Sequence, residues 1–264
     1  MYNFDYHRAG SVEEAVQLLS GASEGTLMGG GMTLIPVLKQ RLANPSDVID
    51  IGGISALSGI SEDGGKVVVG AATTHAAVAS DATVKAKIPA LAALAESIGD
   101  AQVRNRGTIG GSIANNDPAA DYPAALVGLG ATIRTNTREI AADDFFTGLF
   151  ETALGDNEII TAVAFPVPDK AGYAKFPNPA SRYAVVGVMA SQGPAGTRVA
   201  VTGAGPCVFR AADMEAALSS NFSAEALSGA SVSADDLNSD IHASAEYRAH
   251  LVGVMARRAV AAAG

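Results

Sequence analysis

The chain has 264 residues, of which 48% are hydrophobic and 17% charged, so it can bury a core without a disulfide or a structural metal. It carries 18 Lys and Arg against 27 Asp and Glu, a net charge of -9. This balance disfavours a nucleic-acid surface or an anionic membrane surface, because both are bound through clustered cations. We therefore expect no nucleic-acid partner.

The single cysteine, Cys207, excludes an intrachain disulfide and an iron–sulfur cluster held by this chain alone. It also favours a reducing cytoplasm as the location. The four histidines lack the spacing of a helical metal site, so we expect no bound metal. We expect no secretory signal, because the first ten residues lack a basic region followed by an apolar stretch. We expect no membrane span, because no apolar run approaches the roughly 18 residues that a span needs.

The N-terminal part alternates strand and helix, which is typical of an α/β unit. Ser11 and Glu14 form a capping-box pattern at the start of the first helix. The elements expected here are a strand at 2–6, a helix from Ser11, a strand at 25–28, a helix at 33–42 and a strand at 47–51.

The middle of the chain is expected to be mixed helix and strand. In order, we expect a strand at 66–71, helices at 74–79 and 89–98, a loop at 104–112, a helix at 118–129, and strands at 131–135 and 161–165. Pro166 and Pro168 then predict a domain boundary, which divides the chain into 1–167 and 168–264. The smaller second domain is expected to hold strands at 183–190 and 198–202 and helices at 211–218 and 244–262.

Three consecutive glycines, Gly29 to Gly31, lie with Met32 and Thr33 between an expected strand and an expected helix. Glycines allow close approach of a ligand, and backbone N–H groups at a helix start can hold an anion. A tight turn is the plainer alternative. A Rossmann dinucleotide site is disfavoured, although Asp50 lies where a ribose-binding acid would be, because Leu34 occupies the third glycine position.

A second glycine pair lies in the segment Thr108 to Ser112, and Asp121 follows it. A turn before a capped helix would explain this segment alone, with Asp121 charging the first helical turn. The presence of two hydroxyl-flanked glycine loops in one chain favours a shared binding site over two separate turns. Together they indicate two loops that close on one extended ligand with a central diphosphate.

These two motifs resemble those of the FAD-binding subunits of molybdenum hydroxylases, and most closely the medium subunit of aerobic carbon monoxide dehydrogenases. The segments 116–125, 179–186 and 248–251 carry the resemblance further, so it covers nearly the whole chain. It implies an α+β fold: a PCMH/VAO-type FAD-binding domain of two α/β subdomains, followed by a smaller α+β C-terminal domain.

The resemblance also implies the site. The two glycine loops would bind the FAD pyrophosphate, Asp121 the adenosine ribose, and Ile98, Gly99 and Tyr183 would lie near the flavin. Lys175 is a further candidate, with a solvated surface lysine as the alternative. The full set of cofactor-binding residues is Gly29, Gly30, Gly31, Met32, Thr33, Ile98, Gly99, Thr108, Gly110, Gly111, Ser112, Asp121, Lys175 and Tyr183.

Two departures from the family pattern matter for the cofactor. Ser112 stands where many members have Asn, and no His lies beside the first glycine loop, where some distant relatives tether the flavin. FAD is therefore expected to be non-covalent.

The implied function is electron transfer inside a larger complex. A molybdopterin-binding large subunit would oxidise the substrate, and a small subunit with [2Fe-2S] clusters would pass electrons to the FAD of this chain and on to a quinone or NAD. No residue of this chain is expected to be catalytic. Two alternatives remain: a stand-alone flavin-dependent NAD(P)H oxidoreductase, and a non-redox nucleotide-binding subunit that serves assembly.

Overall fold

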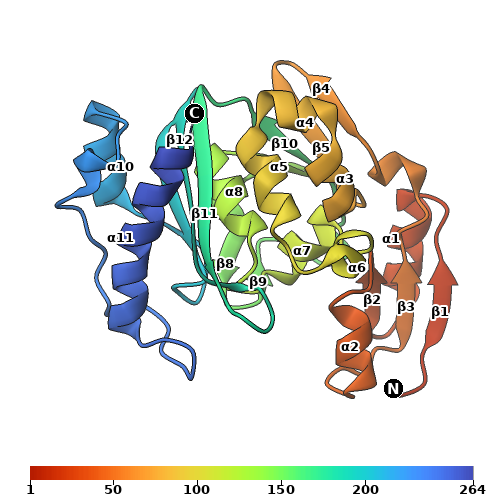
Figure 1. The fold of residues 1–264 in the computed structure, drawn as a ribbon. Coiled ribbons are helices and arrows are strands. Elements are labelled where there is room, and N and C mark those ends of the chain that lie inside the picture. Colours follow the sequence, from red (N-terminus) through yellow and green to blue (C-terminus); the bar gives the residue numbers. More distant parts are fainter. Residues whose placement is uncertain (264) are drawn as a thin grey trace.

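The computed structural model describes residues 1–263 and begins with a three-stranded parallel sheet, ordered β1-β3-β2 (Figure 1). Ser11 caps the first helix, since its Oγ accepts from the N–H of Glu14, while the Glu14 carboxylate accepts from the N–H of Gly10. The expected α/β unit is confirmed. Its elements are β1 (Asp5–Arg8), α1 (Val12–Gly21), β2 (Gly25–Met28), α2 (Leu34–Lys39) and β3 (Asp47–Asp50).

A five-stranded antiparallel sheet follows, ordered β4-β5-β10-β6-β7. Its strands are β4 (Ile60–Asp63), β5 (Lys66–Gly70), β6 (Thr132–Thr135), β7 (Glu139–Ala141) and β10 (Ile160–Pro166). The helices between β5 and β6 pack on this sheet, and Val69, Val163, Leu94 and Leu126 share one buried cluster (Figure 1). These helices are α3 (His75–Ser80), α4 (Ala82–Lys87), α5 (Pro89–Glu96), α6 (Ala101–Arg104), α7 (Ile109–Asn115) and α8 (Tyr122–Leu129).

The loop expected at 104–112 is wrong: α6 ends there and α7 begins at Ile109. Thr108 caps α7, because its Oγ1 accepts from the N–H of Gly111 at 3.1 Å. This cap and tertiary packing offset the low helix propensity of the glycine pair. The helix expected from residue 118 begins only at Tyr122, because a turn precedes it in which Asp117 Oδ1 accepts from the N–H of Ala119.

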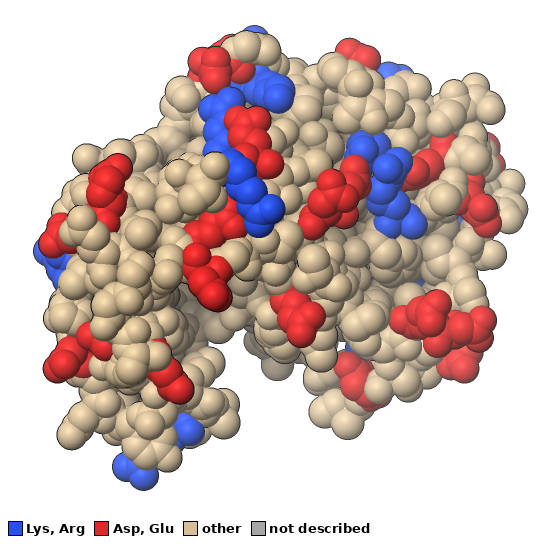
Figure 2. Space-filling model, turned by 180° about the vertical axis from the view of Figure 1, so that it is seen from behind, with Lys and Arg blue, Asp and Glu red and all other residues tan. Residues whose placement is uncertain are grey.

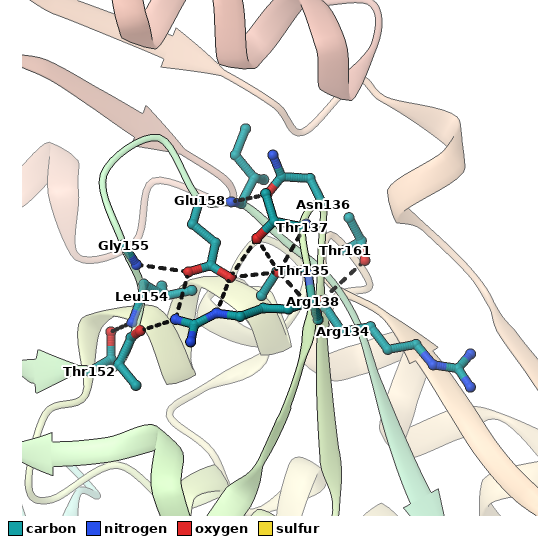
Figure 3. Close-up of polar contacts among 12 residues, drawn as sticks. Arg134, Thr135, Asn136, Thr137, Arg138, Thr152, Leu154, Gly155, Glu158 and Thr161 are labelled. Atoms are coloured by element: carbon teal, nitrogen blue, oxygen red, sulfur yellow. Dashed lines mark hydrogen bonds and ion pairs between the residues drawn. The ribbon is translucent and has the colours of Figure 1, made fainter.

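A polar cluster ties the turn between β6 and β7 to the loop before β10 (Figure 3). The buried carboxylate of Glu158 accepts two hydrogen bonds from Arg138, one each from the hydroxyls of Thr135 and Thr137, and one from the N–H of Gly155. These charge-assisted bonds lower the pKa of Glu158, with the Arg138 contact as the largest cause.

The C-terminal part is a four-stranded antiparallel sheet ordered β11-β12-β13-β14, with α10 and α11 on one face (Figure 1). Helices α8 and α5 lie against the other face. Side chains of β12 therefore alternate between two cores: Val188 packs toward α10 and α11, and Met189 packs toward α8. The elements are β11 (Lys170–Pro177), β12 (Ala184–Gly193), β13 (Gly196–Thr202), β14 (Phe209–Arg210), α10 (Ala212–Ser220) and α11 (Ala245–Ala262).

The remaining elements are short: the 3-10 turns at Ser55–Leu57 and Glu225–Leu227, the helix α9 (Ala142–Phe145), and the hairpin of β8 (Phe146–Gly148) and β9 (Glu151–Thr152). Among residues 1–263, no helix combines the length and the apolar character that crossing a bilayer requires. On the face shown in Figure 2, Lys and Arg form only short groups that alternate with Asp and Glu.

Candidate functional site

The two glycine loops meet in space. A Cβ atom on Gly30 would lie 1.8 Å from the carbonyl oxygen of Arg106, and one on Gly29 would lie 3.0 Å from Thr108 Oγ1. The backbones of the two loops are therefore in direct contact, and only glycine permits this approach at Gly30. The convergence that the paired motifs predicted is present.

The first loop carries free hydrogen-bond donors. Within residues 1–263, the backbone N–H groups of Gly30, Gly31, Met32 and Thr33 donate to no acceptor of the protein. Gly31 has a φ of +74°, which turns the backbone back on itself before α2. A row of unused N–H groups around such a turn is the arrangement that binds phosphate oxygens.

The second loop differs, because its donors are engaged. The N–H of Ile109 donates to Thr73 O and that of Gly110 to Ala71 O, while Gly111 donates to its own cap, Thr108. A Cβ on Gly110 would lie 2.7 Å from both Ala71 Cβ and Ala71 O, so the packing of the chain itself requires this glycine. Gly111 is exposed and meets only the Thr108 hydroxyl within 3.4 Å, so its surface is open to a ligand.

A buried ion pair joins the two expected domains. Lys175 Nζ lies 3.0 Å from Asp121 Oδ1 and also donates to Ser97 O at 3.0 Å, and the two side chains are only 7% and 5% exposed. The Tyr173 hydroxyl donates to the same carboxylate. The alternative of a solvated surface lysine at 175 is therefore wrong. Burial raises the pKa of Asp121, and the Lys175 ammonium and the Tyr173 hydroxyl oppose this.

A cavity of about 490 Å³ lies between α5 and β11. Its lining consists of Ala93, Ser97, Tyr173, Lys175, Pro177, Asn178, Pro179 and Arg182. Arg182 has a φ of +63°, and its guanidinium donates to Gly99 O at 3.1 Å. The neighbouring Tyr183 is part-exposed, and burial together with the charges of Asp117 and Asp121 raises its pKa. None of the residues expected beside the flavin lines this cavity: Gly99 is bonded to its lining residue Arg182, and Tyr183 follows Arg182 in the chain.

Arg104 lies in the sequence between the residues expected beside the flavin and the second glycine loop. From the end of α6, its guanidinium donates to Ile98 O at 2.9 Å and to Gly99 O at 3.2 Å. The chain then continues through Arg106, which meets Gly30 of the first loop, to Thr108 of the second. The sequence analysis did not identify Arg104 as a site residue. Arg182 lies in the segment 179–186, whose resemblance to the family could have indicated it.

Behind the second loop lies an aromatic pair with unpaired polar atoms. Among the described residues, His75 Nδ1 and the Tyr122 hydroxyl are buried without a hydrogen-bond partner, and the two ring centroids are 5.3 Å apart. Burial, with a smaller contribution from the Arg104 charge, lowers the pKa of His75 to about 4. His75 is therefore neutral at pH 7. Its ring packs closely against Gly107, since a Cβ atom on that glycine would lie 2.6 Å from His75 Nε2.

Asp50, the acid considered for a Rossmann site, hydrogen-bonds to residues of the first sheet and of the turn that follows β3. Its carboxylate accepts from the Tyr6 hydroxyl at 2.7 Å and from the N–H of Gly52 at 2.8 Å. Both partners are local to the first sheet.

Two family models match the chain. Residues 2–168 match the FAD binding domain in molybdopterin dehydrogenase, and residues 173–263 match the CO dehydrogenase flavoprotein C-terminal domain. The chain belongs to this family. The expected α+β fold, with an FAD-binding domain and a C-terminal domain of this type, is confirmed.

Two relatives are similar to the chain along nearly their whole length. The chain is 38% identical over 273 residues to the nicotine 6-hydroxylase medium subunit of Paenarthrobacter nicotinovorans, covering 98% of this chain and 96% of that one. It is 35% identical over 277 residues to the carbon monoxide dehydrogenase medium chain of Hydrogenophaga pseudoflava, with the same coverage of the two chains.

Solved structures agree. The reconstituted CO dehydrogenase from Oligotropha carboxidovorans matches with a TM-score of 0.89 at 33% identity, covering 99% of this chain and 97% of that one. Quinoline 2-oxidoreductase from Pseudomonas putida 86 matches with a TM-score of 0.88 at 30% identity, covering 98% and 96%.

The residues present fit the cofactor of this FAD-binding family. A dinucleotide needs donors for its diphosphate and a cavity for its ring, and the chain provides free N–H groups on the first loop and the cavity beside α5. The exposed face of Gly111 leaves room for a ligand beside the Thr108 hydroxyl.

Proposed function

We propose that this chain is the FAD-binding electron-transfer subunit of a molybdenum hydroxylase complex. The observation that carries the proposal is the contact between the two glycine loops, which presents the unused N–H groups of Gly30 to Thr33 beside Thr108. FAD supplies the redox chemistry, since flavins exchange electrons with donors and acceptors, and the protein supplies position and electrostatics.

The chain's residues hold the cofactor by polar contacts. The N–H groups of the first loop bind the diphosphate, and the Thr108 hydroxyl and the open faces of Gly111 and Ser112 complete the cradle. We propose non-covalent binding, because no His lies beside the first loop.

The ring side of the proposed site is the cavity beside α5. Gly99 is bonded to Arg182 of the cavity lining, Ile98 precedes Gly99 and accepts from Arg104, and Tyr183 follows Arg182 in the chain. Asp121 and Lys175 remain proposed cofactor residues. Each already has a protein partner, so a ribose hydroxyl would have to join the hydrogen bonds of Asp121 to Lys175 and Tyr173.

The proposed partners are a molybdopterin-binding large subunit and an iron–sulfur small subunit that carries the [2Fe-2S] clusters. Relatives named as medium subunits or medium chains support this arrangement, and the single cysteine is consistent with clusters held elsewhere. The external acceptor is a quinone or NAD, and the cytoplasmic location belongs to the same proposal.

The test begins with the purified full chain. It is expected to bind about one FAD, released to the supernatant by acid precipitation, and to show negligible turnover with carbon monoxide, purines or aldehydes. Adding the large and small subunits should restore turnover and substrate-dependent flavin reduction.

Three results would contradict this proposal. Flavin that stays in the acid pellet would exclude non-covalent binding. Rapid flavin reduction by NAD(P)H in a chain that captures neither the large nor the small subunit would support a stand-alone oxidoreductase. A chain that binds no flavin would support an assembly subunit.

A further inference from the structure

Two arginines converge on one backbone carbonyl at the ring side of the proposed site. Arg104 donates from Nη1 to Gly99 O at 3.2 Å, and Arg182 donates from Nη1 to the same oxygen at 3.1 Å. Because one oxygen accepts from both side chains, the two guanidinium groups are neighbours, although the residues lie far apart in the sequence. Arg104 ends α6, and Arg182 lies in the loop between β11 and β12.

The positive charges of these two arginines have no counter-charge in the protein. Within residues 1–263, no carboxylate forms an ion pair with Arg104 or Arg182. The nearby Lys175 differs, because it is paired with Asp121. Two adjacent guanidinium charges repel each other, and the shared carbonyl oxygen carries only a partial charge. An anion bound by both groups would offset this repulsion.

Each guanidinium also keeps an unused edge that suits an oxyanion. A guanidinium has five N–H donors, and two parallel bonds from one edge bind a carboxylate or a phosphate. In the described part of the chain, Nε and Nη2 of both arginines donate to no protein acceptor. Those of Arg104 are not sealed from solvent, and Arg182 is exposed. A dissolved anion can therefore reach both edges.

The loop that carries Arg182 holds it in a defined position. Asn178 Oδ1 accepts from the N–H of Ala180 at 2.9 Å and from that of Ser181 at 3.2 Å, and the N–H of Arg182 donates to Asn178 O at 2.9 Å. Arg182 has a φ of +63°, in the left-handed region that long side chains rarely adopt. Strained residues of this kind concentrate at functional sites.

Arg182 also lines the cavity of about 490 Å³ beside α5, a volume in the range of small-molecule sites. Among residues 1–263, neither Asp nor Glu lines this cavity, and Lys175 is its only other cation. Because Asp121 neutralises Lys175, Arg182 supplies the uncompensated charge of the lining. The chain has a net charge of -9, which repels anions at long range, so an anionic ligand needs such a local cationic group.

We propose that Arg104 and Arg182 bind the diphosphate of a nicotinamide dinucleotide at this cavity, and that NAD rather than a quinone is the external acceptor. This inference rests on the proposed function, which leaves both acceptors open. Ubiquinones and menaquinones carry no anionic group for the two guanidiniums, whereas the diphosphate of NAD suits their paired donors. Gly99 is expected beside the flavin and accepts from both arginines, so a dinucleotide anchored here lies next to the flavin ring.

The experiment titrates the full chain, loaded with oxidised FAD, with NAD⁺ in a calorimeter. Oxidised FAD does not react with NAD⁺, so the heat reports binding alone. ADP-ribose is the second probe, since it keeps the diphosphate and lacks the nicotinamide. Arg104→Gln and Arg182→Gln should each raise the Kd of both probes about tenfold or more, because each variant removes a charge-assisted hydrogen bond.

Two further variants sharpen the result. Arg182→Lys keeps the charge and can still donate to Gly99 O, but it lacks the paired donors, so its Kd should lie between those of wild type and Arg182→Gln. Arg258→Gln changes an exposed arginine of α11 and should leave the Kd unchanged. Added NaCl should weaken NAD⁺ binding more in wild type than in either Gln variant. A merely structural role for the arginines would lower the Tm and leave the Kd for NAD⁺ as it is.

Other outcomes overturn the inference. Unchanged NAD⁺ affinity in both Gln variants would place the dinucleotide elsewhere. Loss of FAD from these variants, with unchanged NAD⁺ affinity in the fraction that keeps FAD, would assign the arginines to the diphosphate of the cofactor itself. A wild-type chain that holds FAD and binds no NAD⁺ at millimolar concentration would favour a quinone. If the wild-type chain takes up no FAD, the proposed function itself fails, and the inference fails with it.

Discussion

Gly110 and Gly111 are neighbours in the sequence but meet different surroundings. Gly110 faces Ala71, whereas Gly111 faces open space beside Thr108. Gly110→Ala should therefore lower the free energy of unfolding of the apoprotein by about 1–3 kcal/mol through overpacking. Gly111→Ala should leave stability within about 0.5 kcal/mol and weaken FAD binding, because the new methyl group enters the ligand side.

Urea unfolding of the apoprotein and FAD titration separate the two effects. Each variant serves as the control for the other. Equal loss of stability in both, or unchanged FAD affinity in Gly111→Ala, would show that the second loop only shapes the chain.

The buried Lys175–Asp121 pair offers a second prediction at this scale. Lys175→Met leaves Asp121 buried without its cation, which should cost about 3 kcal/mol of stability. Asp121→Asn combined with Lys175→Met removes both charges, so the double variant should lose less than the sum of the two single variants. Urea unfolding of the three variants measures this coupling, and additive losses would contradict it.

The sequence predicted both glycine loops, but it did not show that the first loop has free N–H groups while those of the second are engaged within the protein. Both loops share glycines and hydroxyls, so their composition cannot show which backbone N–H groups are already used. The partner of Asp121 lies 54 residues away, on a strand that the sequence did not predict. Contacts over such separations follow from the folded topology, and one sequence does not show them.

At the scale of elements, the sequence predicted those helices and strands that are determined by interactions between residues close in the chain. The strand at 25–28 was predicted with its observed bounds, and the capped helix after Ser11 was found. Helix α7 was missed because its two glycines disfavour helix locally, whereas the packing of Gly110 against Ala71 acts across a long separation in the sequence. Strand β11 was missed because its glycine and lysines have a low strand propensity. Its pairing with β12 along its whole length stabilises it.

The turn between β6 and β7 carries a prediction on pH. The pKa of Glu158 is lower in the folded state than the roughly 4.3 of an unfolded chain. Its stabilisation is thus complete above that value and declines as pH falls through it toward the folded pKa. Glu158→Gln should cost about 2 kcal/mol at pH 7, a modest value because Arg138 is half-exposed.

The difference in the free energy of unfolding between wild type and Glu158→Gln should shrink below about pH 4.3, because Glu158 of the unfolded wild-type chain is then protonated. Urea unfolding at pH 7, 5 and 4 measures it. The exposed Glu225 provides the control, since Glu225→Gln should change little at any of these values. A difference that stays constant with pH would contradict the role of the carboxylate.

At the scale of the whole molecule, helix α8 joins the two parts of the chain. All eight of its residues are buried, as expected for a helix that is hydrophobic on every side. Ser191 Oγ donates to Gly128 O, and Arg198 Nε donates to Val127 O, so β12 and β13 bind the backbone of α8 directly. The boundary predicted at Pro166 and Pro168 therefore separates segments of sequence whose cores are continuous in space.

This continuity predicts the behaviour of a fragment that ends at the proposed boundary. Residues 1–167 alone would expose the face of α8 that packs on Met189, and would leave the carbonyls of Val127 and Gly128 without their donors. The fragment should therefore aggregate or unfold without a cooperative transition, and bind no FAD. Co-expression with residues 168–264 should restore both cooperative unfolding and FAD binding, since the missing face returns. Cooperative thermal unfolding of the monomeric 1–167 fragment with bound FAD would contradict this, because it would mean that α8 does not need the C-terminal sheet.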